Sequence, residues 1–269
     1  MDGKSLPWRV VWITGASSGI GFELARQFAQ HDFDVVVVAD DAGIHQAADA
    51  LRSSGAAVSP LQLDLATDEG VEELWTVVSN VGRPLAAAAL NAGIGRGGKF
   101  TRIPLEDDLE VVDVNVRSTV HLAKRVLADM QARDTGRVLF TSSIASTMPG
   151  TYQAVYNASK SFVQSFAEAL QEELKDTAVT ITSLMPGPTD TNFFHRAGMD
   201  DTPVGQSSKD DPAQVAEQGF EALMKGEKKL VAGSVKTKLT GVADKVLPDS
   251  AKGKAHAAMA KPLSDDAAS

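Results

Sequence analysis

Three polar side chains near the middle of the chain have the types and the spacing of a proton-transfer site. Tyr156 and Lys160 are four residues apart in Y-N-A-S-K, and Ser143 precedes Tyr156 by thirteen residues. On a helix, positions i and i+4 share one face, so the phenol and the ammonium would lie side by side. A nearby cation favours the phenolate, which predicts a lowered pKa for Tyr156. Such a tyrosine can be a general acid toward a carbonyl oxygen and a general base toward an alcohol, while Ser143 hydrogen-bonds the same oxygen.

A glycine-rich segment near the start of the chain predicts a nucleotide-binding turn. Residues 9–13 are typical of a short buried strand, and T-G-A-S-S-G-I-G follows at 14–21. Ile20, Leu24 and Phe28 then recur every fourth residue, as on the buried face of a helix. A strand, a glycine turn and a helix in this order place backbone N–H groups where a pyrophosphate can bind. The turn residues expected to contact such a cofactor are Gly15, Ser17, Ser18, Gly19, Ile20 and Gly21.

An aspartate after the second predicted strand indicates which dinucleotide would bind. Residues 34–39 (D-V-V-V-V-A) predict a buried strand, and Asp40 follows it. A carboxylate about 20 residues beyond the glycine turn can bind a ribose 2′-OH and repels a 2′-phosphate. No Arg or Lys occurs between residues 31 and 51, so NAD is expected, with NADP as the alternative. In a second interpretation, Asp40 or Asp41 caps the next helix.

The composition limits the classes of protein to which the chain can belong. With 269 residues, of which 43% are hydrophobic, it can bury one large core and needs no second domain. Cysteine is absent and the five histidines are scattered, so neither thiol chemistry nor a metal site is expected. No run of about 20 apolar residues occurs, and the first residues show no signal pattern. These features predict a cytoplasmic protein with no membrane span.

Strand and helix patterns alternate along the chain, which is typical of a parallel sheet covered on both faces. The expected fold class is therefore α/β, a doubly wound Rossmann-type sheet of about seven strands in a single domain. Ligands of such sheets lie outside the carboxyl ends of the strands, where the residues that follow the predicted strands should converge. Those residues include Gly19, Asp40, Asn91, Ser143 and Pro186. The strands are expected at 9–13, 34–39, 58–63, 85–90, 137–141, 179–184 and 229–233, and the helices after the first at 44–53, 68–80, 106–131 and 151–175.

A series of motifs in a fixed order gives the chain a resemblance to the short-chain dehydrogenase/reductases, in the compact single-domain branch of that superfamily. Besides the glycine turn and the polar triplet, they include D-L at 64–65, N-A-G at 91–93, D-V-N-V at 113–116 and P-G-P-T-D-T at 186–191. The resemblance covers residues 10–191 and continues more weakly to 232. It implies an NAD(P)-dependent oxidoreductase that interconverts a secondary alcohol and a ketone by hydride transfer.

The resemblance also assigns roles to individual residues. Tyr156 would be the general acid or base, Lys160 would tune it and contact the nicotinamide ribose, and Asn115 would complete the catalytic set by holding a water near the lysine. The thirteen-residue offset in the family favours Ser143 over Ser142 as the hydroxyl that orients the carbonyl. Further contacts to the cofactor are expected from Asp64, Leu65, Asn91, Ala92, Gly93, Pro186, Gly187, Thr189 and Thr191, together with Tyr156 and Lys160.

Two other functions fit parts of this pattern. Epimerase or dehydratase chemistry on nucleotide sugars occurs in longer relatives, but the glycine spacing and the lack of an added substrate domain argue against it. A non-catalytic dinucleotide sensor is the second alternative, and the complete catalytic set argues against that. We therefore expect a small-molecule alcohol or ketone as substrate, no nucleic-acid partner, and assembly into a homodimer or homotetramer.

Residues 192–211 follow the last motif, where the family carries a mobile substrate lid. One interpretation makes its apolar side chains a ceiling over the substrate, and the other packs them onto the body of the protein. A basic side chain in the loop at 93–99 would meet an acidic substrate or remain solvated. The candidate substrate contacts are Ile94, Met148, Tyr152, Phe193 and Phe194, with Met199 in the same ceiling and Arg96 or Lys99 as the basic group.

The C-terminal part departs from the family pattern, because no closing aspartate and glycine pair follows the seventh predicted strand. Residues 225–261 hold nine lysines against three carboxylates, a balance of +6 in a chain of net charge −9. Such an extension is expected to dock on its own subunit, on a partner subunit or on an anionic membrane surface. Its apolar residues recur at helical spacing at Val235, Leu239, Val242 and Val246. The predicted organisation is a catalytic domain at 1–233, a basic amphipathic extension at 234–261 and a disordered tail at 262–269.

Overall fold

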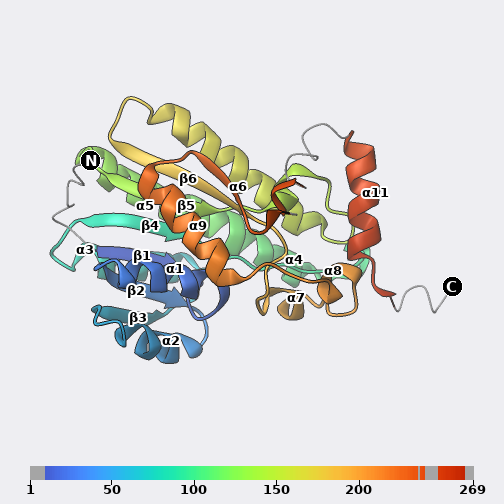
Figure 1. Ribbon diagram of the computed structural model, residues 1–269, viewed down its shortest axis with the longest axis horizontal. Helices are drawn as coiled ribbons and strands as arrows, with labels where there is room; N and C mark the ends of the chain where they lie inside the picture. Colours follow the sequence, from blue (N-terminus) through green and yellow to red (C-terminus); the bar gives the residue numbers. More distant parts are fainter. Residues whose placement is uncertain (1–9, 236, 240–247, 264–269) are drawn as a thin grey trace.

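Runs rich in β-branched and small apolar residues form one sheet of seven parallel strands (Figure 1). The computed structural model describes residues 10–235, 237–239 and 248–263. The strands lie in the order β3-β2-β1-β4-β5-β6-β7, and the predicted doubly wound sheet is thereby confirmed. Their bounds are β1 Val10–Thr14, β2 Asp34–Ala39, β3 Val58–Gln62, β4 Leu85–Leu90, β5 Gly136–Thr141, β6 Val179–Pro186 and β7 Lys229–Ala232.

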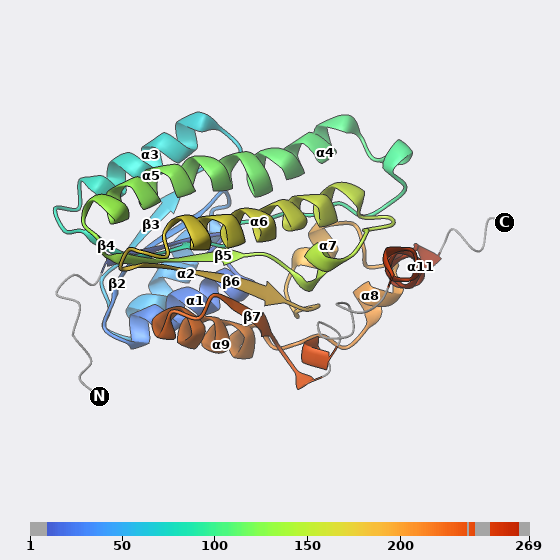
Figure 2. The same ribbon diagram turned by 90° about the horizontal axis from the view of Figure 1, so that it is seen from above.

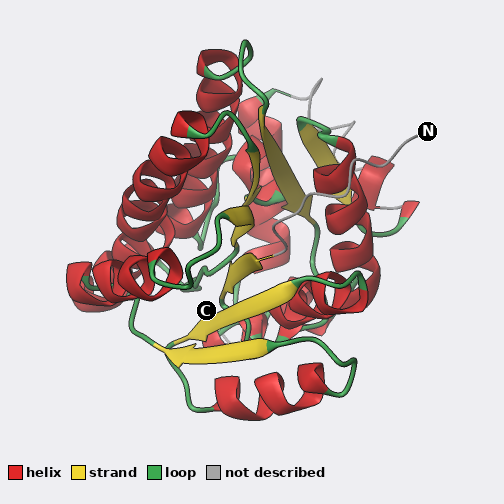
Figure 3. Ribbon diagram, turned by 90° about the vertical axis from the view of Figure 1, so that its left-hand side faces the viewer, coloured by secondary structure: helices red, strands yellow, loops and turns green. Residues whose placement is uncertain are grey.

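Helices cover both faces of the sheet (Figures 2 and 3). Neighbouring residues of a strand point to opposite faces, so in β1 Ile13 packs in one core and Trp12 packs in the other. Because both faces are covered, the central strands are almost entirely apolar. None of the described helices is long and apolar enough to cross a lipid bilayer. The helices of the first face are α1 (Gly19–Gln30), α2 (Gly43–Arg52) and α9 (Pro212–Lys225), and those of the second are α3 (Asp68–Ser79), α5 (Ser118–Ala132) and α6 (Ala154–Glu173).

The fourth strand shows how position in the sheet overrides local propensity. Its sequence is L-A-A-A-A-L, and alanine on its own favours helices. All six residues are buried, and β4 pairs in parallel with β1 on one side and with β5 on the other. Hydrogen bonds to both neighbours and helices on both faces stabilise the extended chain. The strand predicted at 85–90 is confirmed.

One predicted element differs from the structure. The single helix expected at 106–131 is divided into α4 (Leu105–Val112), a π-helical turn at Asp113–Arg117, and α5. The N–H of Ser118 donates to the carbonyl five residues earlier instead of four. Such turns accommodate one extra residue and are frequent at functional sites. Asn115 lies inside the turn, and buried positions keep helical spacing through it, so the sequence gives no signal of the interruption.

Short helices gather at the end of the sheet where the strands have their carboxyl ends (Figure 2). The helix α11 stands beside α8 at this end, so this part of the predicted extension docks on its own subunit. The elements of this end are η1 (Phe100–Arg102), η3 (Ile144–Thr147), α7 (Phe193–Arg196), α8 (Pro203–Gln206) and α11 (Asp249–Ala260).

The predicted apolar stripe of the extension is described only in part. The side chains of Val235 and Leu239 are 74% and 64% exposed, so neither packs on the body of the protein. Val242 and Val246 lie outside the described residues, as do residues 264–269 of the predicted disordered tail.

Candidate active site

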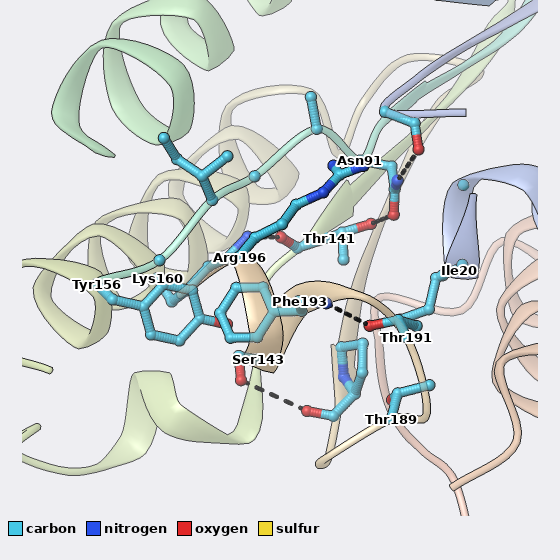
Figure 4. A pocket seen from close by; sticks show the side chains of 18 of the residues that line it. Ile20, Asn91, Thr141, Ser143, Tyr156, Lys160, Thr189, Thr191, Phe193 and Arg196 are labelled. Atoms are coloured by element: carbon cyan, nitrogen blue, oxygen red, sulfur yellow. Dashed lines mark hydrogen bonds between the residues drawn. The ribbon is translucent and has the colours of Figure 1, made fainter. Parts of the chain in front are cut away.

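The carboxyl ends of the strands frame a cleft of about 300 Å³ (Figure 4). Residues that follow β1, β2, β4, β5 and β6 line it, so the structure brings the predicted rim residues together. All of the residues expected to contact a cofactor lie along this cleft. They are Gly15, Ser17, Ser18, Gly19, Ile20, Gly21, Asp40, Asp64, Leu65, Asn91, Ala92, Gly93, Tyr156, Lys160, Pro186, Gly187, Thr189 and Thr191.

The turn between β1 and α1 leaves its backbone open to the cleft. Gly19 has a φ of +57°, and a Cβ there would lie 2.8 Å from Cγ2 of Thr191. A Cβ on Gly21 would lie 2.1 Å from the Gly15 carbonyl oxygen, so side chains are sterically excluded at these two positions. Ser18, the N-cap of α1, makes no side-chain hydrogen bond to the first turn of the helix. The N–H groups at this helix start therefore remain available to an anion, which fits the pyrophosphate of a dinucleotide.

Asn91 ties three strand ends together beneath the cleft. The Thr14 hydroxyl accepts hydrogen bonds from the N–H groups of Asn91 (3.0 Å) and Ala92 (2.9 Å). The Asn91 amide donates to Thr14 O (3.0 Å), and its carbonyl oxygen accepts from the Thr141 hydroxyl (3.0 Å). The sequence predicted N-A-G as a border of the cofactor, but it gave no signal for Thr14 and Thr141. These bonds hold the ends of β1, β4 and β5 in fixed positions.

The two aspartates after β2 have different surroundings. Asp41 accepts hydrogen bonds from the Ser17 hydroxyl (2.7 Å) and from the N–H of Gly43 (2.8 Å), so it is the one that holds the start of α2. Asp40 is exposed and lines the cleft. Arg196 of α7 reaches across the cleft to within 3.7 Å of the Asp41 carboxylate. The absence of Arg and Lys between 31 and 51 therefore did not reveal this cation, because it comes from a distant segment.

Tyr156, Ser143 and Lys160 meet on the far wall of the cleft (Figure 4). The Tyr156 phenol lies beside the Ser143 hydroxyl, which donates a hydrogen bond to Pro186 O (3.5 Å). Ser143 Oγ also accepts from the N–H of Ala145 (3.1 Å), because Ser143 is the N-cap of η3. The Ser142 hydroxyl instead donates to the carbonyl of Lys160 (3.1 Å). Of the two serines, only Ser143 joins the tyrosine.

The pKa values of the pair differ from the sequence-based expectation. Burial raises the pKa of the Tyr156 phenol to about 12, and the neighbouring Ser143 hydroxyl opposes that rise. Burial lowers the pKa of Lys160 to about 8. The Lys160 ammonium donates to Thr141 O (2.9 Å) and lies 5.9 Å from the centre of the Tyr156 ring. The predicted lowering of the Tyr156 pKa is therefore not found, because desolvation of the buried phenol outweighs a charge at this distance.

Asn115 lies behind the cleft wall and holds the loop that follows β4. Its side-chain oxygen accepts from the N–H of Ile94 (2.9 Å), and its amide donates to Ile94 O (2.9 Å) and to the Ser159 hydroxyl (2.9 Å). Both ends of the amide thus hold the backbone of one residue in the loop. The π-helical turn places this side chain against the N-terminal half of α6, beside Lys160.

The sequence profile of short chain dehydrogenases matches residues 9–201. The chain belongs to the short-chain dehydrogenase family. Among its relatives, the 3-oxoacyl-(acyl-carrier-protein) reductase FabG of Pseudomonas aeruginosa is 32% identical to this dehydrogenase over 191 residues, which are 70% of this chain and 77% of the reductase. The predicted resemblance is confirmed, and the dehydrogenase is an oxidoreductase of this family.

Solved structures share the fold of this dehydrogenase. A short-chain dehydrogenase from Sphingobium yanoikuyae in complex with NADPH has a TM-score of 0.77 at 27% identity and covers 82% of this chain and 87% of its own. A short-chain dehydrogenase/reductase from Burkholderia phymatum in complex with NAD has a TM-score of 0.77 at 24% identity and covers 83% and 88%. Because the Burkholderia phymatum protein is only 24% identical, its likeness to this chain shows the fold alone.

The substrate end of the dehydrogenase is lined mainly by apolar side chains. The Phe193 ring lies 5.0 Å from the Tyr156 ring, centre to centre. Met199 is fully buried in an apolar cluster, and Tyr152 packs in the same cluster instead of lining the cleft. The segment 192–211 thus lines the cleft through Phe193 and Phe194 and packs onto the body of the protein through Met199, while its role as a substrate lid stays a prediction. The predicted substrate contacts that line the cleft are Ile94, Met148, Phe193 and Phe194.

Arg96 is paired within the protein instead of facing a substrate. Its guanidinium lies 2.6 Å from the Glu110 carboxylate and 3.6 Å from that of Asp107, both in α4. These contacts fix the loop after β4 against α4. The described residues contain no cluster of three or more His, Cys, Asp or Glu side chains that could ligate a metal ion.

Several residues that line the cleft were not among the sequence candidates. Gln153 lies three residues before Tyr156 and has no motif of its own. His256 of α11 lies in a stretch of alanine, lysine and glycine whose small side chains give no clear apolar stripe. The cleft residues that sequence reasoning missed include Gln153, Arg196, Val204, His256 and Met259.

Proposed function

We propose that this dehydrogenase catalyses the NAD(P)-linked interconversion of a secondary alcohol and a ketone, with Tyr156 as the general acid or base. The observation that carries the proposal is the placement of Tyr156 and Ser143 side by side in a cleft whose glycine turn fits a pyrophosphate. Its 32% identity to a 3-oxoacyl reductase also supports reduction of a carbonyl carbon. Apolar walls beside the two hydroxyls suit an uncharged substrate.

Each group of the chain has a defined part in this reaction. Ser143 and Tyr156 hold the substrate oxygen between their hydroxyls, which fixes the carbon that reacts. The bound nicotinamide supplies or accepts the hydride. Tyr156 donates its phenolic proton to the oxygen during reduction and recovers it during oxidation. Lys160, with a pKa lowered to about 8, is able to gain and lose a proton near working pH and can pass it between Tyr156 and solvent.

We infer that NAD is the preferred cofactor, and Asp40 is the residue that decides it. The Asp40 carboxylate lines the cleft at the end of β2, where it would bind a ribose 2′-OH and repel a phosphate. Two observations favour NADP instead. Arg196 brings a cation to the same region, and the dehydrogenase from Sphingobium yanoikuyae was solved with NADPH. Asp40 would repel a 2′-phosphate and Arg196 would attract it, so the measured cofactor preference tests which of the two side chains dominates.

The proposal is tested by the oxidation of a panel of secondary alcohols with NAD and with NADP, followed by cofactor absorbance. We expect turnover with a higher kcat/KM for NAD. Asp40→Ala should narrow that preference about tenfold, because about 1.4 kcal/mol of like-charge repulsion is one decade in affinity. Arg196→Ala should act in the opposite direction by weakening NADP more than NAD.

Two results would contradict these proposals separately. A panel with no turnover in either direction with either cofactor would refute the proposed reaction. A wild-type preference for NADP that Asp40→Ala leaves unchanged would refute the role of Asp40 while leaving the reaction class intact. Fluorescence titration with NADH and NADPH gives the same comparison of affinities without turnover.

A further inference from the structure

The helix α11 stands beside α8 (Figure 1), and it contacts two segments that also line the cleft. On the side of the loop before α6, the Thr151 hydroxyl donates to Gly253 O (3.2 Å). On the side of the lid, α11 contacts α8, and the N–H of Leu263 donates to Asp201 O (2.9 Å). Two of its side chains, His256 and Met259, reach the cleft.

His256 presents one hydrogen-bonding nitrogen to the cleft. The residue is 6% exposed, and its Nδ1 lies 3.0 Å from the Thr151 carbonyl oxygen. A carbonyl oxygen only accepts, so Nδ1 carries the proton. Burial lowers the pKa of His256, so the ring is neutral near pH 7 and Nε2 keeps its lone pair. No side chain or backbone group among the described residues donates to Nε2, which leaves it as an acceptor for a ligand.

Gln153 is a second polar group near this end of the cleft. It follows Thr151 by two residues, is 6% exposed and lines the cleft. As the N-cap of α6 it makes no side-chain hydrogen bond to the helix, and its carboxamide has no partner within the described parts of the chain. Its amide N–H groups and amide oxygen are therefore available to a ligand in the cleft.

The wall around these two groups is apolar. Met259 comes from the same helix as His256, and Val204 comes from α8. Met148, Phe193 and Phe194 complete it. A substrate that fits here therefore has an apolar body, and its polar atoms are confined to the two ends where hydrogen-bonding groups lie.

We propose that His256 and Gln153 form a subsite for a hydroxyl group of the substrate, separate from the oxygen held by Tyr156 and Ser143. A hydroxyl matches the pair, because its O–H can donate to Nε2 of His256 and its oxygen can accept from the Gln153 amide. The substrate class is thus an apolar ketone or alcohol that carries a second hydroxyl. This inference rests on the proposed function, since it names the substrate of the same site.

The test compares pairs of ketones that differ by one hydroxyl group: cyclohexanone with hydroxycyclohexanone, acetophenone with hydroxyacetophenone, and benzophenone with hydroxybenzophenone. For each pair, the ratio of kcat/KM of the hydroxylated to the plain ketone is measured. His256→Asn is the informative variant, because its amide can keep the bond to Thr151 O while the acceptor at Nε2 is lost. Gln153→Leu removes the other member of the subsite.

Wild type should favour the hydroxylated member of at least one pair, and either variant should lower that ratio about tenfold. Met259→Ala is the matched control on the same helix, and it should change both members of a pair together and leave the ratio in place. Thermal unfolding of each variant verifies that α11 is still docked. Calorimetric titration of the same pairs gives the ratio as Kd values, independently of turnover.

The subsite is overturned if wild type prefers no hydroxylated member, or if His256→Asn leaves the ratio of every pair unchanged. A wild type that binds the pairs selectively but turns over none of them with either cofactor would contradict the proposed function and leave the subsite standing.

Discussion

The cleft has two halves that are built in different ways. The half proposed to bind the cofactor consists of the turn at 15–21, the ends of β1, β2 and β4, and Asp40 beyond β2, and backbone atoms come to the surface of the cleft there. The half proposed to bind the substrate consists of α7, α8, α11 and the loop before α6, and side chains line it. Residues 105 positions apart, Thr151 and His256, are hydrogen-bonded there. A site built from backbone requires glycine at fixed positions, whereas a site built from side chains accepts many sequences.

The largest effect is expected where the two halves meet. Tyr156→Phe removes one hydroxyl and keeps the ring that packs on Phe193. Turnover should fall about 10²–10⁴-fold, because the proton donor is lost, while the affinity for cofactor should stay close to that of wild type. Steady-state kinetics and a fluorescence titration with NADH measure the two quantities. Near-normal turnover would mean that another group transfers the proton.

The second prediction concerns the buried charge of Lys160. Burial lowers its pKa from 10.5 to about 8, so between those values the unfolded chain binds more protons than the folded one. Wild-type stability should therefore rise with pH through this window relative to Lys160→Met, by roughly 3 kcal/mol in total. Urea unfolding at a series of pH values measures the difference in stability. Lys124→Met, at an exposed position of α5, is the control for losing a lysine. If the difference in unfolding free energy between wild type and Lys160→Met does not change with pH, burial does not lower the pKa of Lys160.

The third prediction compares a glycine from each half. Gly21→Ala places a Cβ 2.1 Å from the Gly15 carbonyl oxygen, which should destabilise the fold by about 1–3 kcal/mol and weaken cofactor binding. Gly253→Ala in α11 meets only ordinary contacts, the nearest at 3.8 Å, and should stabilise by up to about 1 kcal/mol through helix propensity. Chemical denaturation of both variants decides the matter. Similar losses of stability in the two variants would contradict the idea that only the half built from backbone requires glycine.

The smallest effect is expected at Met259, whose side chain lines the cleft although the residue is 45% exposed. Met259→Ala should change stability by no more than about 0.5 kcal/mol, as is usual at exposed positions. The KM for benzophenone should rise a few-fold, and that for cyclohexanone should change less, because only the larger ketone reaches α11. A loss of several kcal/mol in the free energy of unfolding would instead show that Met259 packs as a core residue.

The fold was predictable because its sheet is covered on both faces. The central strands then have to be apolar runs, and the glycine or polar residues that follow them mark the rim, as Gly19 and Asn91 do. Even the alanine strand at Leu85–Leu90 could be placed, since its position between a helix and a motif outweighs its propensity. The placement of Tyr156 beside Lys160 was also predictable, because both residues lie on one helix, four positions apart.

The substrate half could not be predicted to the same extent. Arg196 and His256 reach the cleft from α7 and α11, and no local pattern relates either of them to the residues that they meet. The pKa of Tyr156 was also missed, because it depends on burial by the lid and not on the spacing to Lys160. Tyr152 was predicted to line the cleft but packs in an apolar cluster instead, since adjacent positions in a loop can face opposite ways.

The π-helical turn at Asp113–Arg117 has a consequence for how this chain can change in length. A regular helix that gained one residue would turn everything beyond it by about 100°. Here the insertion is absorbed within a single turn, so α4 keeps its contact with α6 and α5 keeps its contact with β4. Removing one residue of the turn is expected to restore an ordinary helix and to displace Asn115, and with it the hydrogen bonds to the Ile94 loop and to Ser159. Along this stretch of helix, the π-helical turn positions Asn115, whereas α4 and α5 on either side of the turn make the packing contacts.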